Sequence, residues 1–123
     1  MIEPATTADL KPEPAPQPDP IVRCRACSHA ITSQRQAIEV NRAHEHTFRN
    51  PAGYSFHVLC YRQASGALRT GTPTTLDTWF PGYAWSYALC QECQVHLGWF
   101  FQGEDGFAGL IATRLLRPYG PAR

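Results

Sequence analysis

The sequence predicts a single, mainly β domain built from two small antiparallel sheets packed on each other. The chain has 123 residues, which is the size of one domain. Its apolar runs are short, rich in aromatic and β-branched residues, and separated by residues that favour turns. Two pairs of cysteines, each with a two-residue gap, lie near the start of the predicted domain and in its later half. Together these observations favour an antiparallel β class.

The predicted domain spans residues 21–118. Residues 1–20 hold six of the eleven prolines of the chain, so we expect a disordered, proline-rich tail there and a short C-terminal tail at 119–123. The first tail lacks a basic segment followed by an apolar one, so no secretory signal is predicted. No apolar run is long enough to cross a bilayer. We therefore expect a cytoplasmic protein with no membrane partner.

Within the domain, strands and turns alternate. Residues 97–102 and 107–116 flank a polar loop and are predicted to pair as a hairpin, although the apolar spacing of the second segment also fits a helix. The remaining predicted elements are strands at 37–40, 46–49 and 54–60, a turn at 50–53, and a short helical turn at 63–68.

The two cysteine pairs predict a structural metal site. Cys24 and Cys27 form one pair, and Cys90 and Cys93 form the other. Tight turns at this spacing can direct all four thiolates to one point, which suits a single tetrahedral zinc ion. Two unrelated pairs of buried or redox-active thiols are the alternative, which the absence of a βαβ pattern disfavours. Four protein ligands leave no open position, so the zinc would stabilise the fold without catalysing a reaction.

Cys60 is the fifth cysteine, and it lies in an alternating segment that points it inward. A small buried hydrophobic residue is favoured over a nucleophile. With two complete thiolate pairs present, the histidines are not needed as ligands, and solvated or hydrogen-bonded structural roles are expected for them. These are His29, His44, His46, His57 and His96.

The charge pattern argues against nucleic acid as a partner. The formal net charge is +1, the pI is about 7.7, and the basic residues are scattered. The sequence also lacks a Ser-His-Asp pattern, a glycine-rich phosphate loop and an identifiable carboxylate pair. A non-enzymatic function is therefore expected.

The three tryptophans gather around a turn and a cysteine pair. Pro81 and Gly82 suit the centre of a β-turn that folds Trp85 back toward Trp79. The strand after the second cysteine pair would bring Trp99 into range. These rings are either part of a small core or the walls of an aromatic box. Such a box would accept a cation or a compact neutral ring with polar edges.

In these features the chain resembles the cereblon-type thalidomide-binding domain, also called the CULT domain, including its small single-domain bacterial members. The resemblance covers roughly residues 22–116. It rests on both cysteine pairs, on residues 50–54 (NPAGY), on residues 79–85 (WFPGYAW), and on His96-Leu-Gly-Trp99 with Phe101.

The resemblance implies a β-tent-like fold of two antiparallel sheets pinned by zinc. It implies that the tryptophans form three walls of a pocket for a cyclic imide, such as the glutarimide ring of thalidomide-type ligands. Backbone groups of residues 77–79 would hydrogen-bond the imide, and residues 50 and 51 would lie at the mouth. The implied ligand-binding set is Trp79, Trp85, Trp99, Phe101, Asp77, Thr78, Asn50 and Pro51.

The expected partner is thus a small cyclic imide or a modified peptide end, bound by a monomer, with no ubiquitin-ligase adaptor inferred. This chain has Asp77 where the animal proteins carry histidine, so a side-chain contact from that histidine is lost. Two other functions stay open. One is a zinc-stapled enzyme resembling B-type methionine sulfoxide reductases, with Cys60 as its reactive cysteine. The other is an aromatic-cage reader of a methylated ammonium.

Overall fold

The structure is a computed structural model that describes residues 18–118. Residues 1–17 of the tail predicted at 1–20, and the tail predicted at 119–123, therefore lie outside the described residues. Within residues 18–118, the ordered elements are strands and short 3-10 turns. No helix in this range reaches the length and apolarity that a membrane span requires.

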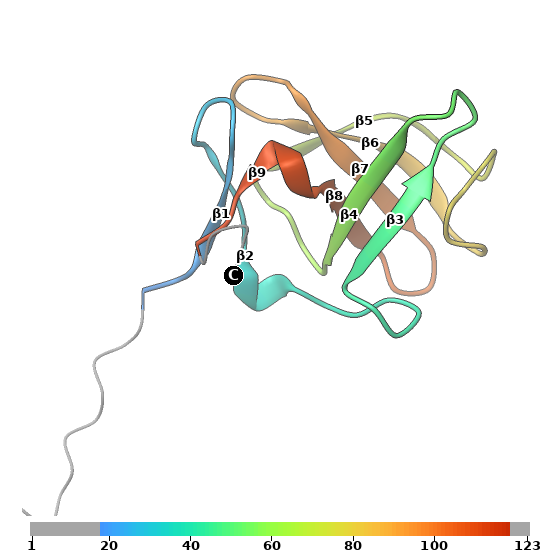
Figure 1. Cartoon of the computed structure of the whole chain (residues 1–123), viewed down its shortest axis with the longest axis horizontal. Helices are drawn as coiled ribbons and strands as arrows, with labels where there is room; N and C mark the ends of the chain where they lie inside the picture. The colour runs from blue at the N-terminus through green and yellow to red at the C-terminus, as the bar shows by residue number, and fades with distance from the viewer. Residues whose placement is uncertain (1–17, 119–123) are drawn as a thin grey trace, which may run out of the picture.

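Nine strands form two antiparallel sheets, which confirms the predicted fold class (Figure 1). The smaller sheet has the order β2-β1-β9, and the larger has the order β3-β4-β8-β7-β6-β5. The strands are β1 Ile21–Cys24, β2 Ala30–Ser33, β3 Glu45–Arg49, β4 Ser55–Tyr61, β5 Ala67–Thr74, β6 Ala84–Cys90, β7 His96–Gln102, β8 Phe107–Ile111 and β9 Leu115–Leu116. Two 3-10 turns, η1 Gln34–Gln36 and η2 Ala112–Arg114, complete the described elements.

The larger sheet is apolar on both faces at its centre. Every residue of β8 is buried, and so are residues 58–61 of β4. Because successive side chains of a strand point to opposite faces, these residues serve two clusters. Leu59 and Tyr61 pack with the smaller sheet, whereas Val58 and Cys60 pack in a second, aromatic cluster on the other face. The smaller sheet thus covers one face and leaves the other to the aromatic residues.

Three predicted elements match the structure closely. The strands predicted at 46–49, 54–60 and 97–102 correspond to β3, β4 and β7 within one residue at most of their ends. The predicted hairpin is also present, since Phe101 pairs with Phe107 and Gly98 with Leu110. However, its second strand stops at Ile111, and the chain then turns through η2 into β9 of the smaller sheet.

Other predictions were wrong. Residues 37–40 form two isolated bridges, Ala37 with Tyr61 and Val40 with Ala43, and not a strand. Residues 63–68 form a turn leading into β5 and not a helical turn. The physical reason lies at Gly66, whose N–H donates to the carbonyl of Ile31 in the smaller sheet. This contact with a distant strand overrides the local helical preference. Strands β1, β2, β5 and β6 were not predicted.

Candidate functional site

The two cysteine pairs occupy matching turns, one on each sheet. Cys24 ends β1 and Cys90 ends β6, so each first cysteine is placed by a strand. The residue after each pair closes the turn. Ser28 donates its N–H to the carbonyl of Cys24 at 2.7 Å, and Gln94 donates to the carbonyl of Cys90 at 2.8 Å. Both closing residues adopt the left-handed backbone conformation, with a φ of 68° at Ser28 and 65° at Gln94. The same type of hydrogen-bonded turn therefore positions the thiols of both cysteine pairs.

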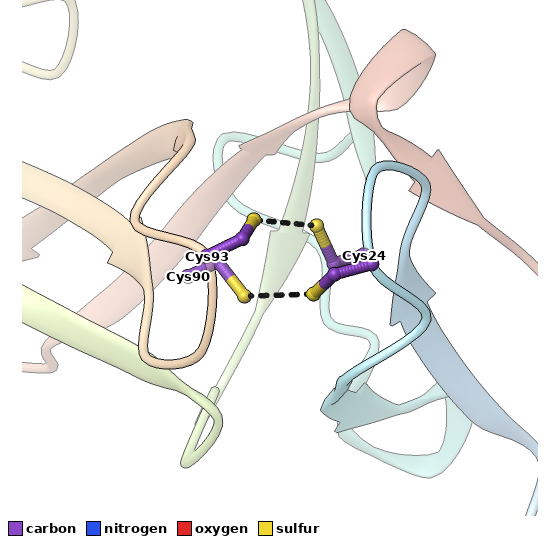
Figure 2. A group of neighbouring side chains, drawn as sticks. Cys24, Cys90 and Cys93 are labelled. Atoms are coloured by element: carbon purple, nitrogen blue, oxygen red, sulfur yellow. Dashed lines mark hydrogen bonds between the residues drawn. The ribbon is translucent and has the colours of Figure 1, made fainter.

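The four sulfur atoms fit one tetrahedral metal ion. They all lie within 4.8 Å of one another. The Sγ atoms of Cys24 and Cys93 are 3.7 Å apart, and those of Cys27 and Cys90 are 3.5 Å apart (Figure 2). A zinc–sulfur bond of about 2.3 Å in tetrahedral geometry requires sulfur–sulfur separations of about 3.8 Å. The donor set and its spacing thus suit one zinc ion, and the cluster consists of the four predicted cysteines.

This cluster links the two sheets. Figure 2 shows the turn that carries Cys24 facing the turn that carries Cys90 and Cys93. Cys24 and Cys90 are fully buried, so half of the donor set is shielded from water. A metal ion held by four protein thiolates has no free position for substrate. A zinc ion bound there would fix the smaller sheet on the larger one.

A pocket of about 350 Å³ opens on the aromatic face of the larger sheet. This volume lies within the range of small-molecule sites in proteins. All three tryptophans of the chain line it. Its lining residues are Asn50, Pro51, Phe56, Asp77, Trp79, Trp85, Tyr87, His96, Trp99 and Phe101. Seven of the eight residues of the predicted ligand-binding set are among them.

The turn after Trp79 has the predicted form. The N–H of Tyr83 donates to the carbonyl of Phe80 at 2.9 Å, which places Pro81 and Gly82 at the centre of a β-turn. Gly82 has a φ of 92°, a conformation that glycine adopts without strain. The turn therefore lets the chain enter β6 directly, with Trp85 as its second residue.

Each tryptophan wall is held by a contact with another residue of the domain. Trp79 stacks on Phe48 with ring centroids 4.8 Å apart and planes 8° apart. The indole Nε1–H of Trp85 donates to the carbonyl of Leu76 at 2.7 Å. Trp99 is only 8% exposed and meets Trp79 edge to face at 4.8 Å. The walls are thus held in place before any ligand binds.

The loop at the pocket mouth is closed by its own hydrogen bonds. The N–H of Asn50 donates to the carbonyl of Tyr54 at 2.8 Å, and the N–H of Tyr54 donates to Oδ1 of Asn50 at 2.9 Å. The N–H of Gly53 donates to the carbonyl of Asn50. These bonds hold Asn50 and Pro51 against the pocket.

The segment before Trp79 forms a tight turn. The N–H of Thr78 donates to the carbonyl of Thr75 at 3.1 Å, and Asp77 adopts a left-handed φ of 54°. Thr78 does not line the pocket, whereas Asp77 and Trp79 do. Within the described part of the chain, no hydrogen bond uses the N–H of Trp79 or the carbonyl of Asp77. A backbone donor and an acceptor are therefore free beside the indole walls.

Three lining residues were not predicted from the sequence: Phe56, Tyr87 and His96. Tyr87 lies two residues after Trp85 on β6 and packs edge to face against it at 5.3 Å, so the period of two could have identified it. Phe56 packs edge to face on Trp99 at 5.3 Å. Its place depends on the pairing of β4 with β8, which local sequence does not reveal.

His96 is a neutral wall of the pocket. Its Nε2–H donates to the carbonyl of Gly98 at 2.9 Å, and its Nδ1 accepts from Arg114 at 3.3 Å. Burial lowers the pKa of His96, and the nearby charge of Arg114 lowers it further, although the bond to Gly98 opposes both effects. The ring packs edge to face on Trp99 at 4.9 Å.

Cys60 is buried, as predicted. Its side chain is 0% exposed and packs in the aromatic cluster with Trp99 and Phe101. Burial raises the pKa of the Cys60 thiol to about 12, so it is a thiol and not a thiolate at neutral pH. Among the described residues, no group that could hold a metal includes a histidine. His44 and His46 instead bond to backbone carbonyls, of Ile38 and of Val40 and Ala43 respectively.

Similarity to curated proteins is clear, although no family model matches the sequence. The chain is 38% identical over 101 residues to Protein cereblon of Danio rerio, covering 76% of this chain and 23% of that protein. It is 38% identical over 73 residues to Protein cereblon of Gallus gallus, covering 54% of this chain and 16% of that protein. It is 34% identical over 82 residues to Protein cereblon of Drosophila melanogaster, covering 64% of this chain and 14% of that protein. The chain thus spans less than a quarter of the length of these relatives.

Proposed function

Because this chain contains a cereblon-type (CULT) domain, we propose that its three-tryptophan pocket is a non-enzymatic binding site for cyclic imides. The ligand is a glutarimide-like ring, either free or at the modified end of a peptide. The observation that carries this proposal is the meeting of Trp79, Trp85 and Trp99 around one pocket of small-molecule size. A flat ring packs well between such walls because its two faces are apolar.

The backbone supports recognition of the ring edge. An imide presents an N–H between two carbonyl groups. The free carbonyl of Asp77 can accept from that N–H, and the free N–H of Trp79 can donate to a neighbouring carbonyl. Thr78 does not line the pocket and its N–H is already used within the turn, so no contact with the ring is assigned to it. The ring would therefore be oriented by main-chain groups and held by aromatic faces.

The expected affinity is modest. Burying about 100 Å² of a ring contributes about 2.5 kcal/mol. Each of two or three hydrogen bonds adds about 1 kcal/mol, before the entropy of association is subtracted. A dissociation constant between about 0.1 mM and 1 mM is expected for glutarimide alone. Rigid walls favour the tighter end of this range, because little side-chain order is lost on binding.

The properties of Cys60 argue against a reductase. B-type methionine sulfoxide reduction would need Cys60 as nucleophile, but its thiol is fully buried and its pKa is raised to about 12. The other four cysteines are committed to the metal cluster. No described cysteine is thus both accessible and free to attack a substrate.

Intrinsic fluorescence offers a direct test, because every tryptophan of the chain lines the pocket. Glutarimide added to the zinc-loaded protein is expected to change the emission with a saturable curve. Trp85→Ala removes one of three walls, and its affinity is expected to fall about fourfold, since one wall supplies about 0.8 kcal/mol of the roughly 2.5 kcal/mol gained from ring burial. Phe100→Ala is the matched control, because Phe100 lies on β7 next to Trp99 but does not line the pocket.

Other outcomes would point elsewhere. If folded, zinc-loaded protein shows no change at millimolar glutarimide, the proposal is wrong. Binding of a trimethyllysine peptide in place of glutarimide would favour an ammonium reader. If the wild-type protein reduces methionine sulfoxide and Cys60→Ser does not, the result would favour a methionine sulfoxide reductase.

A further inference from the structure

The pocket carries one formal charge among its lining residues. Asp77 supplies that charge, and no lysine or arginine is among the described residues that line the pocket. His96 contributes no positive charge, because its Nε2–H is bonded to Gly98 and its Nδ1 accepts from Arg114. A ligand in this pocket therefore meets a site whose net charge is negative.

The charge of Asp77 is not neutralised by a neighbour. The ion pairs of the described residues join Arg35 to Asp19 and His57 to Glu45, and neither involves Asp77. Arg114 donates to the backbone carbonyl of His96 at 2.7 Å and does not line the pocket, so it approaches the site only through His96. The field of the carboxylate is thus available to a bound molecule.

The aromatic walls act in the same direction. The face of an indole ring carries partial negative charge and attracts cations. The positive N–H edge of Trp85 is directed at the carbonyl of Leu76, so it is not offered to a ligand. The faces of Trp79, Trp85 and Trp99 and the carboxylate of Asp77 therefore all favour positive charge.

We propose that Asp77 makes the pocket selective for cyclic imides that carry a positively charged amine beside the ring, over neutral and anionic imides. This inference rests on the proposed function. The selective group is placed by a fixed turn, in which Thr78 donates to Thr75 and Asp77 holds a left-handed φ of 54°. The ring lies between the tryptophan side chains, and its amine substituent lies near the carboxylate of Asp77 at the rim of the pocket.

The experiment compares one ring with three charges. The probes are 3-aminopiperidine-2,6-dione, its N-acetyl derivative and its N-succinyl derivative, which are cationic, neutral and anionic respectively. Unsubstituted glutarimide is the reference for the pocket itself. Measurements at pH 6.5 and low ionic strength keep the amine protonated, since an α-amine has a pKa of about 7.7–8.0. Dissociation constants come from tryptophan fluorescence and calorimetry.

The wild-type protein is expected to bind the amine about three- to fivefold more tightly than the acetyl derivative, because the two charges meet at a partly solvated rim. The succinyl derivative is expected to bind more weakly than both. This preference should shrink as salt is added. In Asp77→Asn the ratio of amine to acetyl affinity should fall to about 1. Asparagine suits the left-handed backbone, so the turn is preserved.

Asp105→Asn is the matched control, because it removes the same formal charge from a residue that does not line this pocket. It should leave the ratio unchanged. If glutarimide binds but the ratio is about 1 in the wild type, or persists in Asp77→Asn, the inference is overturned and the proposed function stands. If glutarimide itself does not bind, the proposed function fails and the inference fails with it.

Discussion

One imidazole ring connects the pocket to the rest of the domain. His96 follows the second cysteine pair by three residues, packs edge to face on Trp99, and bonds to Arg114 of η2. The residue Arg25, between the first two cysteines, donates its N–H to the carbonyl of Arg114 at 3.0 Å. A continuous set of bonded residues therefore runs from the metal cluster to the pocket wall.

The buried state of His96 predicts a dependence of stability on pH. Burial lowers its pKa in the folded protein, whereas the unfolded value is about 6.5. Below about pH 6.5 the unfolded chain binds a proton that the folded protein does not, so stability falls as pH falls. The slope from this residue is at most about 1.4 kcal/mol per pH unit. Urea unfolding between pH 7 and 5.5, with zinc present, should show a shallower slope in His96→Gln than in the wild type. Equal slopes would contradict this prediction.

At the residue scale, the sequence predicted the metal ligands and most of the pocket. The cysteines could be recognised because a two-residue gap fixes their local geometry. His96 was expected to have only a structural role, because two complete thiolate pairs made a histidine ligand unnecessary. Its spacing from Trp99 along the chain does not follow the period of two, so it gave no sign of a shared face. A register shift between β6 and β7, at Ala88 and Leu89, changes which residues share a face. Only the paired strands reveal it.

At the scale of elements, close backbone contacts decide where the strands can lie. A Cβ at Gly98 would lie 2.1 Å from the carbonyl oxygen of Gly109 on the adjacent strand. A Cβ at Gly66 would lie 1.9 Å from the carbonyl oxygen of Ala30 in the other sheet. Glycine at these two positions therefore allows β7 to approach β8, and β5 to enter beside the smaller sheet.

Gly98→Ala is accordingly expected to destabilise the domain by about 3 kcal/mol or more, because the strands must move apart next to Trp99. Gly53→Ala is the comparison, since a Cβ there meets nothing within 4 Å and only the φ of 94° opposes it. Its cost is expected to be about 1–2 kcal/mol. Chemical unfolding of both variants measures the difference. Similar losses of stability in the two variants would show that the close contact between β7 and β8 does not add to the cost of Gly98→Ala.

The strands that were predicted correctly are those whose sequence pattern is visible within the strand itself. Strands β3, β4 and β7 have aromatic or β-branched residues at alternating positions. Strand β5 has the sequence ALRTGTPT, with a glycine and a proline that locally disfavour a strand. It forms because it is an edge strand, where Pro73 removes no ladder bond that the sheet needs. Its pairing with β6 outweighs the local preference.

At the scale of the whole molecule, the metal cluster and the apolar cluster between the sheets hold the domain together. Val22, Ile31 and Leu115 of the smaller sheet pack with Leu59 and Leu97 of the larger one. The smaller sheet has only three short strands, so its own contacts are few. A metal ion that joins β1 to β6 is expected to supply much of the stability that this small interface lacks.

Removal of the metal should therefore affect the whole fold. Cys27→Ser is expected to reduce zinc content below one ion per chain and to lower Tm by about 10 °C or more, which corresponds to about 2 kcal/mol for a domain of this size. Cys60→Ser is the matched control for zinc content, because Cys60 lies outside the cluster. Elemental analysis and calorimetry measure both effects. Retention of one zinc ion with an unchanged Tm in Cys27→Ser would contradict the assigned ligand set.

The sequence by itself predicted the class of fold, the cluster of four cysteines and the three tryptophans of the pocket, because each depends on short spacings that fix local geometry. The tertiary structure decided which strands pair, which residues join the tryptophans, and that Asp77 lies unpaired at the pocket. These features depend on contacts between segments far apart in the chain. Their free energy is gained only when both sheets are assembled, so no local pattern specifies them.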